Sequence, residues 1–179
     1  EPAYSADGRY VFYSVDGTSG TTFEYNKNSV GSIFEIRRWD LQTGEEETII
    51  KGAGGAARPT PSHDGKKLAY IKRIDMTTAL YVKDLKSGVE TQVYFGLERD
   101  MQEAFAEHGV VPSFSWTPDD EKLVFWQGGK FHSIDVESKK LTNIPVHIKA
   151  EKKVTPALRF AVDVAPENFK VKMARWTQI

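Results

Sequence analysis

Pro112–Val136, PSFSWTPDDEKLVFWQGGKFHSIDV, decides the fold of this chain. It contains three short strand-like segments that are separated by two tight turns. Its central run, Leu123–Trp126, is apolar at consecutive positions, which favours a strand covered on both faces. Turn residues bound the run after a few positions, so a helix in the core is disfavoured. The stretch therefore predicts a small antiparallel β-sheet.

Two further copies of this pattern lie upstream. The turn Thr117–Asp120 aligns with Ser5–Gly8 and Ser62–Gly65, and the shared aspartates are 57 and 55 residues apart. An apolar run follows each turn at the same offset. Self-similarity at a fixed period is typical of repeat folds, in which each copy forms one structural unit. The sequence thus predicts three repeats.

A second turn signature closes each repeat. Asp40–Gly44 and Asp84–Gly88 share the pattern Asp-Leu-x-Ser/Thr-Gly, and Asp135–Lys139 differs at its last position. Glycine there supplies the positive φ that tight hairpin turns require. Lys139 in a left-handed conformation is expected to cost roughly 1 kcal/mol relative to glycine. Four antiparallel strands per repeat, apolar on both faces, are typical of a β-propeller blade.

Both turns, with the apolar strand between them, resemble the blade repeat of TolB-like β-propellers across nearly the whole chain. Three stretches are more similar to the N-terminal propeller region of bacterial amidohydrolases that carry such blades ahead of a metallohydrolase barrel: Thr22–Lys27, Gly54–Pro61 and Arg99–Glu103. Ala6 and His63 stand where the family pattern has proline. The resemblance implies a bacterial protein that is exported to the periplasm or cell envelope.

The predicted fold class is all-β: about three four-stranded antiparallel blades form a partial or open propeller, with one short helix between blades two and three. Residues 1–179 are expected to form a single domain. Its parts are blade one at about 1–52, blade two at about 53–96, a helical linker at 97–109, blade three at about 110–147, and a tail with the start of a further blade at 148–179. A closed propeller needs about four blades or more. We therefore expect a segment of a larger propeller, or a chain that associates through its exposed blade faces.

The linker carries the helix that the sequence predicts. Asp100 can cap its first turn, Glu103 completes an approximate capping box, and Gly109 is placed to end it. Together with Asp100 and Glu103, Glu107 and His108 could form a set of metal ligands. Glu107 and His108 are adjacent, however, and adjacent residues point about 100° apart on a helix. Because capping already explains the acidic residues, we expect no metal site there. An open alternative is that this helix packs on a neighbouring domain.

Blade one contains an insertion at residues 16–32, which is rich in Gly, Ser, Thr and Asn. Propeller loops carry binding functions, so two aromatic side chains in this insertion are candidates for contact with a partner. The alternative is a mobile loop without a partner, whose two aromatic side chains anchor it to the blade. The candidate interaction residues of the insertion and the linker are Phe23, Tyr25, Arg99, Asp100, Glu103 and His108.

No catalytic, metal-binding or cofactor-binding residue is predicted. Cysteine is absent, the four histidines form neither His-x-His nor His-Glu-x-x-His, and no Gly-x-Ser-x-Gly elbow occurs. Trp116 and Trp126 lie in apolar strands, so we expect core packing rather than a stacking surface for a sugar or base. A formal charge of −1 without a basic groove argues against nucleic-acid binding. No apolar run is long enough for membrane insertion.

The expected function is a non-catalytic propeller segment that serves as scaffold or protein-interaction region of a larger exported hydrolase with an amidohydrolase-like parent. Its expected partners are the rest of its own propeller or a catalytic domain. Two alternatives stay open. One is a stand-alone TolB-like envelope module for protein–protein association, and the other is the gating propeller of a serine peptidase of the prolyl oligopeptidase type. On each hypothesis the chemistry lies outside these 179 residues.

Overall fold

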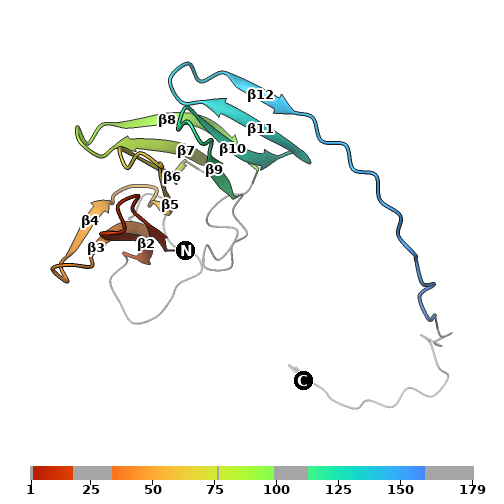
Figure 1. Ribbon diagram of the computed structural model, residues 1–179, viewed down its shortest axis with the longest axis horizontal. Coiled ribbons are helices and arrows are strands. Elements are labelled where there is room, and N and C mark those ends of the chain that lie inside the picture. Colours follow the sequence, from red (N-terminus) through yellow and green to blue (C-terminus); the bar gives the residue numbers. More distant parts are fainter. Residues whose placement is uncertain (1, 18–33, 76, 99–112, 160–179) are drawn as a thin grey trace, which may run out of the picture. The chain divides into compact units, whose positions relative to one another are not determined.

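The computed structural model describes residues 2–17, 34–75, 77–98 and 113–159. These residues form three antiparallel sheets of four strands each, which we call blades one, two and three (Figure 1). Blade one contains β1 (Ala3–Tyr4), β2 (Tyr10–Asp16), β3 (Phe34–Asp40) and β4 (Glu46–Ile50). Blade two contains β5 (Ala57–Pro61), β6 (Lys67–Ile74), β7 (Thr77–Asp84) and β8 (Glu90–Leu97). Blade three contains β9 (Phe114–Trp116), β10 (Lys122–Gln127), β11 (Lys130–Asp135) and β12 (Leu141–Ile144). The predicted all-β class with three four-stranded blades is confirmed.

Helices are absent from the residues that the structure describes. The helix expected between residues 100 and 109 falls outside that part of the chain, as does the strand expected to begin a further blade at residue 171. Within the described ranges, nothing has the helical length and apolar character that a membrane span requires.

The chain divides into two units, residues 1–146 and residues 147–179. All three blades belong to the first unit. In the second unit, residues 147–159 are described; they form neither helix nor strand, and their side chains are exposed.

The predicted aspartate turn joins the first two strands of each blade. In all three turns a hydroxyl donates a hydrogen bond to the aspartate two residues later: Ser5 to Asp7 (2.6 Å), Ser62 to Asp64 (2.7 Å) and Thr117 to Asp119 (2.5 Å). The residue after this aspartate has a left-handed φ of 70°, 71° or 56°; it is Gly8, Gly65 or Asp120, respectively. Blade three therefore places an aspartate where the other blades have glycine.

The second turn of each blade also forms as predicted. The carboxylate of its aspartate accepts backbone N–H groups two or three residues further along, as Asp84 does from Ser87 at 2.7 Å and Asp135 from Ser138 at 2.7 Å. The turn ends on a left-handed residue: Gly44 (φ 74°), Gly88 (φ 76°) and Lys139 (φ 58°). Lys139 thus adopts the left-handed conformation for which the sequence analysis gives a cost relative to glycine.

Two apolar clusters hold the blades face to face. The cluster between blades one and two includes Phe12 and Ile36 from blade one and Leu68 and Tyr70 from blade two. The cluster between blades two and three contains Ala69, Ile71 and Leu80 from blade two with Leu123, Phe125 and Ile134 from blade three. Successive side chains of a strand point to opposite faces. Blade two is therefore covered on both faces, as its consecutive apolar residues require.

The connections between strands alternate between two ends of the blades. At the first end, which we call the turn end, six connections of five residues each occur at 5–9, 41–45, 62–66, 85–89, 117–121 and 136–140. At the opposite end, which we call the loop end, the connections are 17–33, 51–56, 75–76, 98–113 and 128–129. The two longest, of 17 and 16 residues, thus share one end.

Candidate interaction surfaces

All side chains predicted for interaction lie outside the described residues, namely Phe23, Tyr25, Arg99, Asp100, Glu103 and His108. The two segments that carry them are the long connections between β2 and β3 and between β8 and β9. Both segments therefore start and finish at the loop end.

Arg58 of blade two bonds to blade one and to the residue before β9 at the loop end. It lies in β5 with a left-handed φ of 58°. Its backbone N–H donates to the hydroxyl of Ser14 in blade one at 3.0 Å, and its Nη2 donates to the hydroxyl of Ser113, next to β9, at 3.2 Å. The backbone of Arg58 is thus tied to blade one, and its guanidinium lies beside the residue that precedes β9.

Gly54 allows the chain to enter blade two beside Arg73. Its φ is 81°, and a Cβ built on it would lie 1.8 Å from the carbonyl oxygen of Arg73. In return, the backbone N–H of Arg73 donates to the Gly54 carbonyl at 3.1 Å. No residue other than glycine fits this approach.

The two tryptophans of blade three have different surroundings. Trp116 is 6% exposed, and its Nε1 donates to the Thr60 carbonyl in blade two at 2.9 Å, so its predicted core packing is confirmed. For Trp126 the prediction is wrong, because this side chain is 42% exposed. It lies on the face of β10 that points away from blade two, since Leu123 and Phe125 occupy the opposite face. Burial of one face of a strand does not establish burial of the other.

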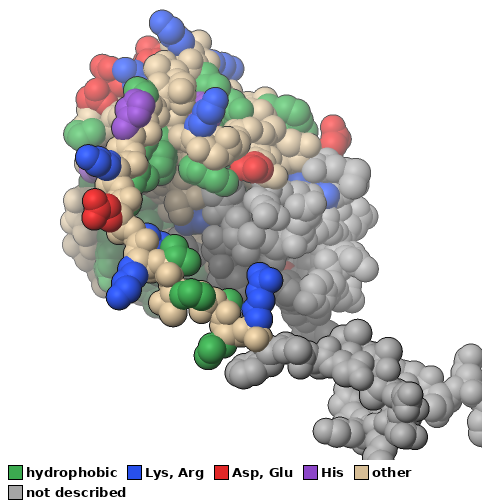
Figure 2. All heavy atoms as spheres, turned by 90° about the vertical axis from the view of Figure 1, so that its right-hand side faces the viewer, with side chains coloured by type: hydrophobic (Ala, Val, Ile, Leu, Met, Phe, Trp, Pro, Cys, Tyr) green, Lys and Arg blue, Asp and Glu red, His purple; other side chains and the backbone are tan. Residues whose placement is uncertain are grey.

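A row of apolar side chains continues from Trp126 across blade three. Trp126 pairs with Phe131, and Phe131 pairs with Ile144. Phe131 is 45% exposed, and Val124 is half-buried on the same face. Figure 2 shows hydrophobic side chains that reach the molecular surface between charged ones. We call Val124, Trp126, Phe131 and Ile144 the outer face of blade three.

Blade one has a comparable face on the side away from blade two. Tyr4 pairs with Val11, and Val11 pairs with Trp39, which is 43% exposed. Tyr13 lies on the same face and donates its hydroxyl to the Glu46 carboxylate. Burial, together with this bond to a carboxylate, raises the pKa of Tyr13 to about 12. We call Tyr4, Val11, Tyr13 and Trp39 the outer face of blade one.

Asp120 joins blade three to blade two at the turn end. Its Oδ1 accepts the backbone N–H of His63 at 2.9 Å and lies 2.7 Å from His63 Nδ1, and its Oδ2 accepts the backbone N–H of Asp64 at 2.8 Å. Burial acts to raise the pKa of Asp120, but the hydrogen bonds from His63 and Asp64 outweigh it and leave the pKa lowered. The left-handed conformation of Asp120 therefore serves a contact between blades.

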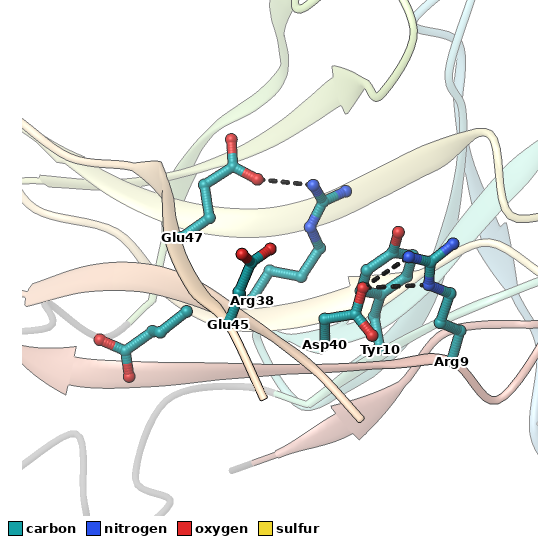
Figure 3. A pocket seen from close by; sticks show the side chains of 7 residues that line it. Arg9, Tyr10, Arg38, Asp40, Glu45 and Glu47 are labelled. Carbon is teal, nitrogen blue, oxygen red and sulfur yellow. Dashed lines mark hydrogen bonds and ion pairs between the residues drawn. The ribbon is translucent and has the colours of Figure 1, made fainter. Parts of the chain in front are cut away.

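A charged pocket of about 550 Å³ opens at the turn end of blade one (Figure 3). The guanidinium groups of Arg9 and Arg38 lie over the Tyr10 ring, 5.0 and 4.4 Å from its centroid. Arg9 donates two hydrogen bonds to Asp40 Oδ2, at 3.0 and 2.7 Å, and Arg38 donates to Glu47 at 2.5 Å. The complete lining is Arg9, Tyr10, Arg38, Asp40, Glu45, Glu46 and Glu47.

The electrostatics of this pocket do not suit proton transfer by Asp40 at neutral pH. The Arg9 guanidinium, aided by the backbone N–H groups of Gln42 and Thr43, lowers the pKa of Asp40 to about 2. Such a carboxylate stays ionised at neutral pH and is a poor general base there. In the part of the chain that the structure describes, no three His, Asp or Glu side chains gather to hold a metal ion.

Sequence patterns do not reveal Asp120 or the pocket. One signal for Asp120 is positional: Gly8 and Gly65 occupy its place in the other two turns, so a side chain there suggests a contact outside its own turn. The pocket side chains come from three separate segments, and they meet only because β3 pairs with β2 on one side and with β4 on the other.

Comparison with known proteins agrees with this architecture. No protein-family model matches the chain. An alignment of 89 positions, which covers 46% of the chain, is 30% identical to the Tol-Pal system protein TolB of Hahella chejuensis and covers 21% of that protein. The chain thus spans about a fifth of this curated relative.

Solved structures share the fold at lower identity. TolB from Acinetobacter baumannii superposes with a TM-score of 0.58 at 20% identity, over 79% of this chain and 31% of that one. The β-propeller domain of the Trilobed protease from Pyrococcus furiosus gives 0.54 at 20% identity, over 81% and 42%. The acylaminoacyl peptidase of Pyrococcus horikoshii gives 0.52 at 20% identity, over 81% and 25%. In its three blades and in its turn motifs, the chain resembles a TolB-like β-propeller.

Proposed function

We propose that this chain is a non-catalytic propeller segment that binds a partner domain of a larger exported hydrolase through its loop end. The observation that carries the proposal is the unequal length of the connections. All six at the turn end have five residues, whereas two at the loop end have 17 and 16. Loops on a rigid scaffold carry binding functions because they vary without disturbing the strands. Because the length of the connections varies at the loop end and not at the turn end, we place the binding surface for the partner domain at the loop end.

Charge at the loop end supports a protein partner. Arg58 is fixed there by its bonds to Ser14 and Ser113. The side chains predicted for interaction belong to the two long connections at the same end. Arginine and aromatic residues are the types that dominate the binding energy of protein interfaces.

The comparisons support a hydrolase as the parent protein. Proteins with this fold include the propeller domain of a protease and an acylaminoacyl peptidase. They favour, as a second candidate, a propeller that gates a serine peptidase. The resemblance of Thr22–Lys27, Gly54–Pro61 and Arg99–Glu103 to amidohydrolase propellers favours the first candidate, and the match to TolB supports export to the cell envelope.

The test compares the 179-residue chain with the protein encoded by its complete reading frame. The isolated chain is expected to hydrolyse no amide, ester or peptide substrate, whereas the complete protein hydrolyses at least one class. A His-x-His barrel in the reading frame supports the amidohydrolase parent, and a nucleophile elbow supports the peptidase. Enzyme-like turnover by the isolated chain overturns the proposal.

Amide hydrogen exchange locates the partner face. In the complete protein, amides of residues 51–55, 113 and 128–129 at the loop end are expected to exchange more slowly than in the isolated chain. Residues 85–89 at the turn end are the internal control and are expected to exchange equally in both. Protection confined to the turn end contradicts the assignment of the loop end.

A further inference from the structure

The first turns of blades one and two have the same backbone hydrogen bonds. In each, a glycine N–H donates to the carbonyl of the residue that begins the turn: Gly8 to Ser5 at 2.9 Å and Gly65 to Ser62 at 3.1 Å. In each, the carboxylate of the turn aspartate accepts the backbone N–H two residues later at 3.0 Å. The two turns therefore offer equivalent backbone N–H groups at their second and third positions.

In blade two these N–H groups bind a carboxylate of the neighbouring blade. They belong to His63 and Asp64, and they donate to the two oxygens of Asp120 at 2.9 and 2.8 Å. Asp120 is 7% exposed. Burial acts to raise its pKa, but the hydrogen bonds leave the pKa lowered, so the buried carboxylate is ionised at neutral pH. The junction of blades two and three thus contains a carboxylate-binding site that the chain itself fills.

The junction of blades one and two has the same N–H groups but a glycine in place of the aspartate. Ala6 and Asp7 supply the N–H groups, and among the described residues no other residue accepts a hydrogen bond from either. Gly65 is the equivalent of Asp120, and a Cβ built on it would lie 3.5 Å from the Ala6 Cβ. The position that carries the carboxylate in blade three therefore faces the second residue of the neighbouring turn here as well.

A pocket of about 250 Å³ opens at this junction. Ala6, Asp7 and Gly65 line it, and so do the larger side chains of Tyr10 and Leu85. Pockets for drug-sized ligands usually have volumes of about 300–1,000 Å³. The volume of this one suits a short side chain or a small organic acid.

Arg38 supplies the positive charge of this pocket. It pairs with Phe12 across the sheet, and Phe12 is buried between blades one and two, so Arg38 lies on the face of β3 toward blade two. Among the described residues, its side chain donates one hydrogen bond, to Glu47 (Figure 3). A guanidinium carries five N–H donors. Arg38 can therefore donate to a ligand while it keeps the bond to Glu47.

Two carboxylates of the lining limit the charge that a ligand can carry. Asp7 and Asp64 both line the pocket. Asp120 has equivalent neighbours, since Asp64 donates its N–H to it and Asp119 precedes it in the chain. A singly charged carboxylate is thus accommodated beside such aspartates, whereas the greater charge of a phosphate would meet more repulsion.

We propose that the pocket between blades one and two binds a carboxylate, in the place that Asp120 fills between blades two and three. The backbone N–H groups of Ala6 and Asp7 hold its two oxygens, and the Arg38 guanidinium balances its charge. The carboxylate comes from a small organic acid or from an acidic side chain of another polypeptide. The site does not rest on the proposed partner domain, since that domain is assigned to the loop end.

Titration of the ¹⁵N-labelled 179-residue chain with sodium propionate tests the site, at an ionic strength kept constant with sodium chloride. The amide signals of Ala6 and Asp7 are expected to shift along a saturable curve. Those of His63 and Asp64 are the internal control and should not shift, because Asp120 already accepts these N–H groups. A neutral peptide that contains one aspartate is titrated in parallel. Both probes are expected to bind; tighter binding of the peptide assigns the carboxylate to a polypeptide, and equal affinity assigns it to a free acid.

Three variants test the residues of the site. Gly65→Asp places a carboxylate where blade three has one, and it is expected to raise the dissociation constant of propionate at least about 10-fold. Arg38→Gln removes the positive charge and should raise it about 10-fold. The matched control is Gly88→Asp, which adds the same charge at a left-handed turn position outside the pocket lining, with φ of 76° against 71° for Gly65. It should bind propionate as the wild type does.

Asp120→Gly tests the same idea in reverse. Removal of this carboxylate frees the N–H groups of His63 and Asp64, so their amide signals are expected to respond to propionate. Because the site then forms at a second junction, this variant and Arg38→Gln decide the question if Gly65→Asp does not fold.

Three outcomes overturn the proposal. The first is a wild-type chain whose Ala6 and Asp7 signals do not move at about 100 mM propionate, where a site with a dissociation constant of about 1–10 mM is nearly saturated. The second is a folded Gly65→Asp chain that binds propionate as tightly as the wild type. The third is an equal loss of binding in Gly88→Asp, because it means that net charge and not the pocket governs the response.

Discussion

Lys139 holds the left-handed position that Gly44 and Gly88 hold in the equivalent turns, with φ of 58°. A side chain with a Cβ is strained in this region, whereas glycine is not. Lys139→Gly is therefore expected to raise the free energy of unfolding by about 1 kcal/mol. Urea unfolding followed by circular dichroism measures the change. The reverse substitution, Gly88→Lys, is the control and should lower the free energy by a similar amount; a Lys139→Gly chain no more stable than the wild type contradicts the strain.

Asp120 occupies a left-handed position too, but here glycine is expected to destabilise the chain. The substitution Asp120→Gly relieves the backbone and removes the bonds to His63 and Asp64 at 2.7–2.9 Å. Hydrogen bonds to a charged group contribute about 1.5–3 kcal/mol, which exceeds the strain that is relieved. We expect a net loss of about 1 kcal/mol in urea unfolding. A gain in stability would show that local turn geometry outweighs the contact between blades.

At the scale of elements, a side chain at Gly54 in the connection from β4 to β5 is expected to destabilise the chain more than a side chain at Gly52. Gly54→Ala brings a Cβ against the Arg73 carbonyl, whereas Gly52→Ala, at φ 112°, meets open space. We expect Gly54→Ala to cost about 2–3 kcal/mol, because backbone has to move, and Gly52→Ala about 1 kcal/mol from strain alone. Thermal unfolding of the two variants checks the difference. Equal losses would mean that the close approach at Gly54 is relieved cheaply.

The strands and turns of this chain could be predicted from the sequence, whereas the burial of single side chains could not. Turns and strands are local: Asp84, its hydrogen bond to Ser87 and the glycine that ends the turn lie within five residues. Burial is not local. Trp116 and Trp126 occur in similar apolar strands, and only the neighbouring blade distinguishes them. The pocket around Tyr10 likewise depends on strand pairing across the 17-residue connection between β2 and β3.

For the whole molecule, the repeated turns predict sensitivity to acid. Hydrogen bonds to the turn carboxylates lower the pKa of Asp7, Asp40, Asp64, Asp84, Asp119 and Asp135. A pKa lower in the folded than in the unfolded chain stabilises the fold above the unfolded value of about 4, and this contribution disappears as pH falls through the folded value. For Asp40 that value is about 2.

The free energy of unfolding is therefore expected to fall steadily as the pH is lowered from about 5 to about 2. Urea midpoints measured across this range test the expectation. Asp40→Asn should be less stable than the wild type at neutral pH, and the difference should shrink toward pH 2 as the wild-type carboxyl is protonated. A wild-type profile that stays flat over this range contradicts the role of the turn carboxylates.

The uniform five-residue connections at the turn end have a consequence for how such a chain changes in evolution. Every hairpin at that end closes over the same length, so a crossover placed within any two equivalent turns joins strands in their original register. Duplication, deletion or exchange of a blade at such a turn then keeps the length of the hairpin connection. Recombination of the gene is therefore best tolerated within the turn-end connections, whereas the loop-end connections can change in length and sequence.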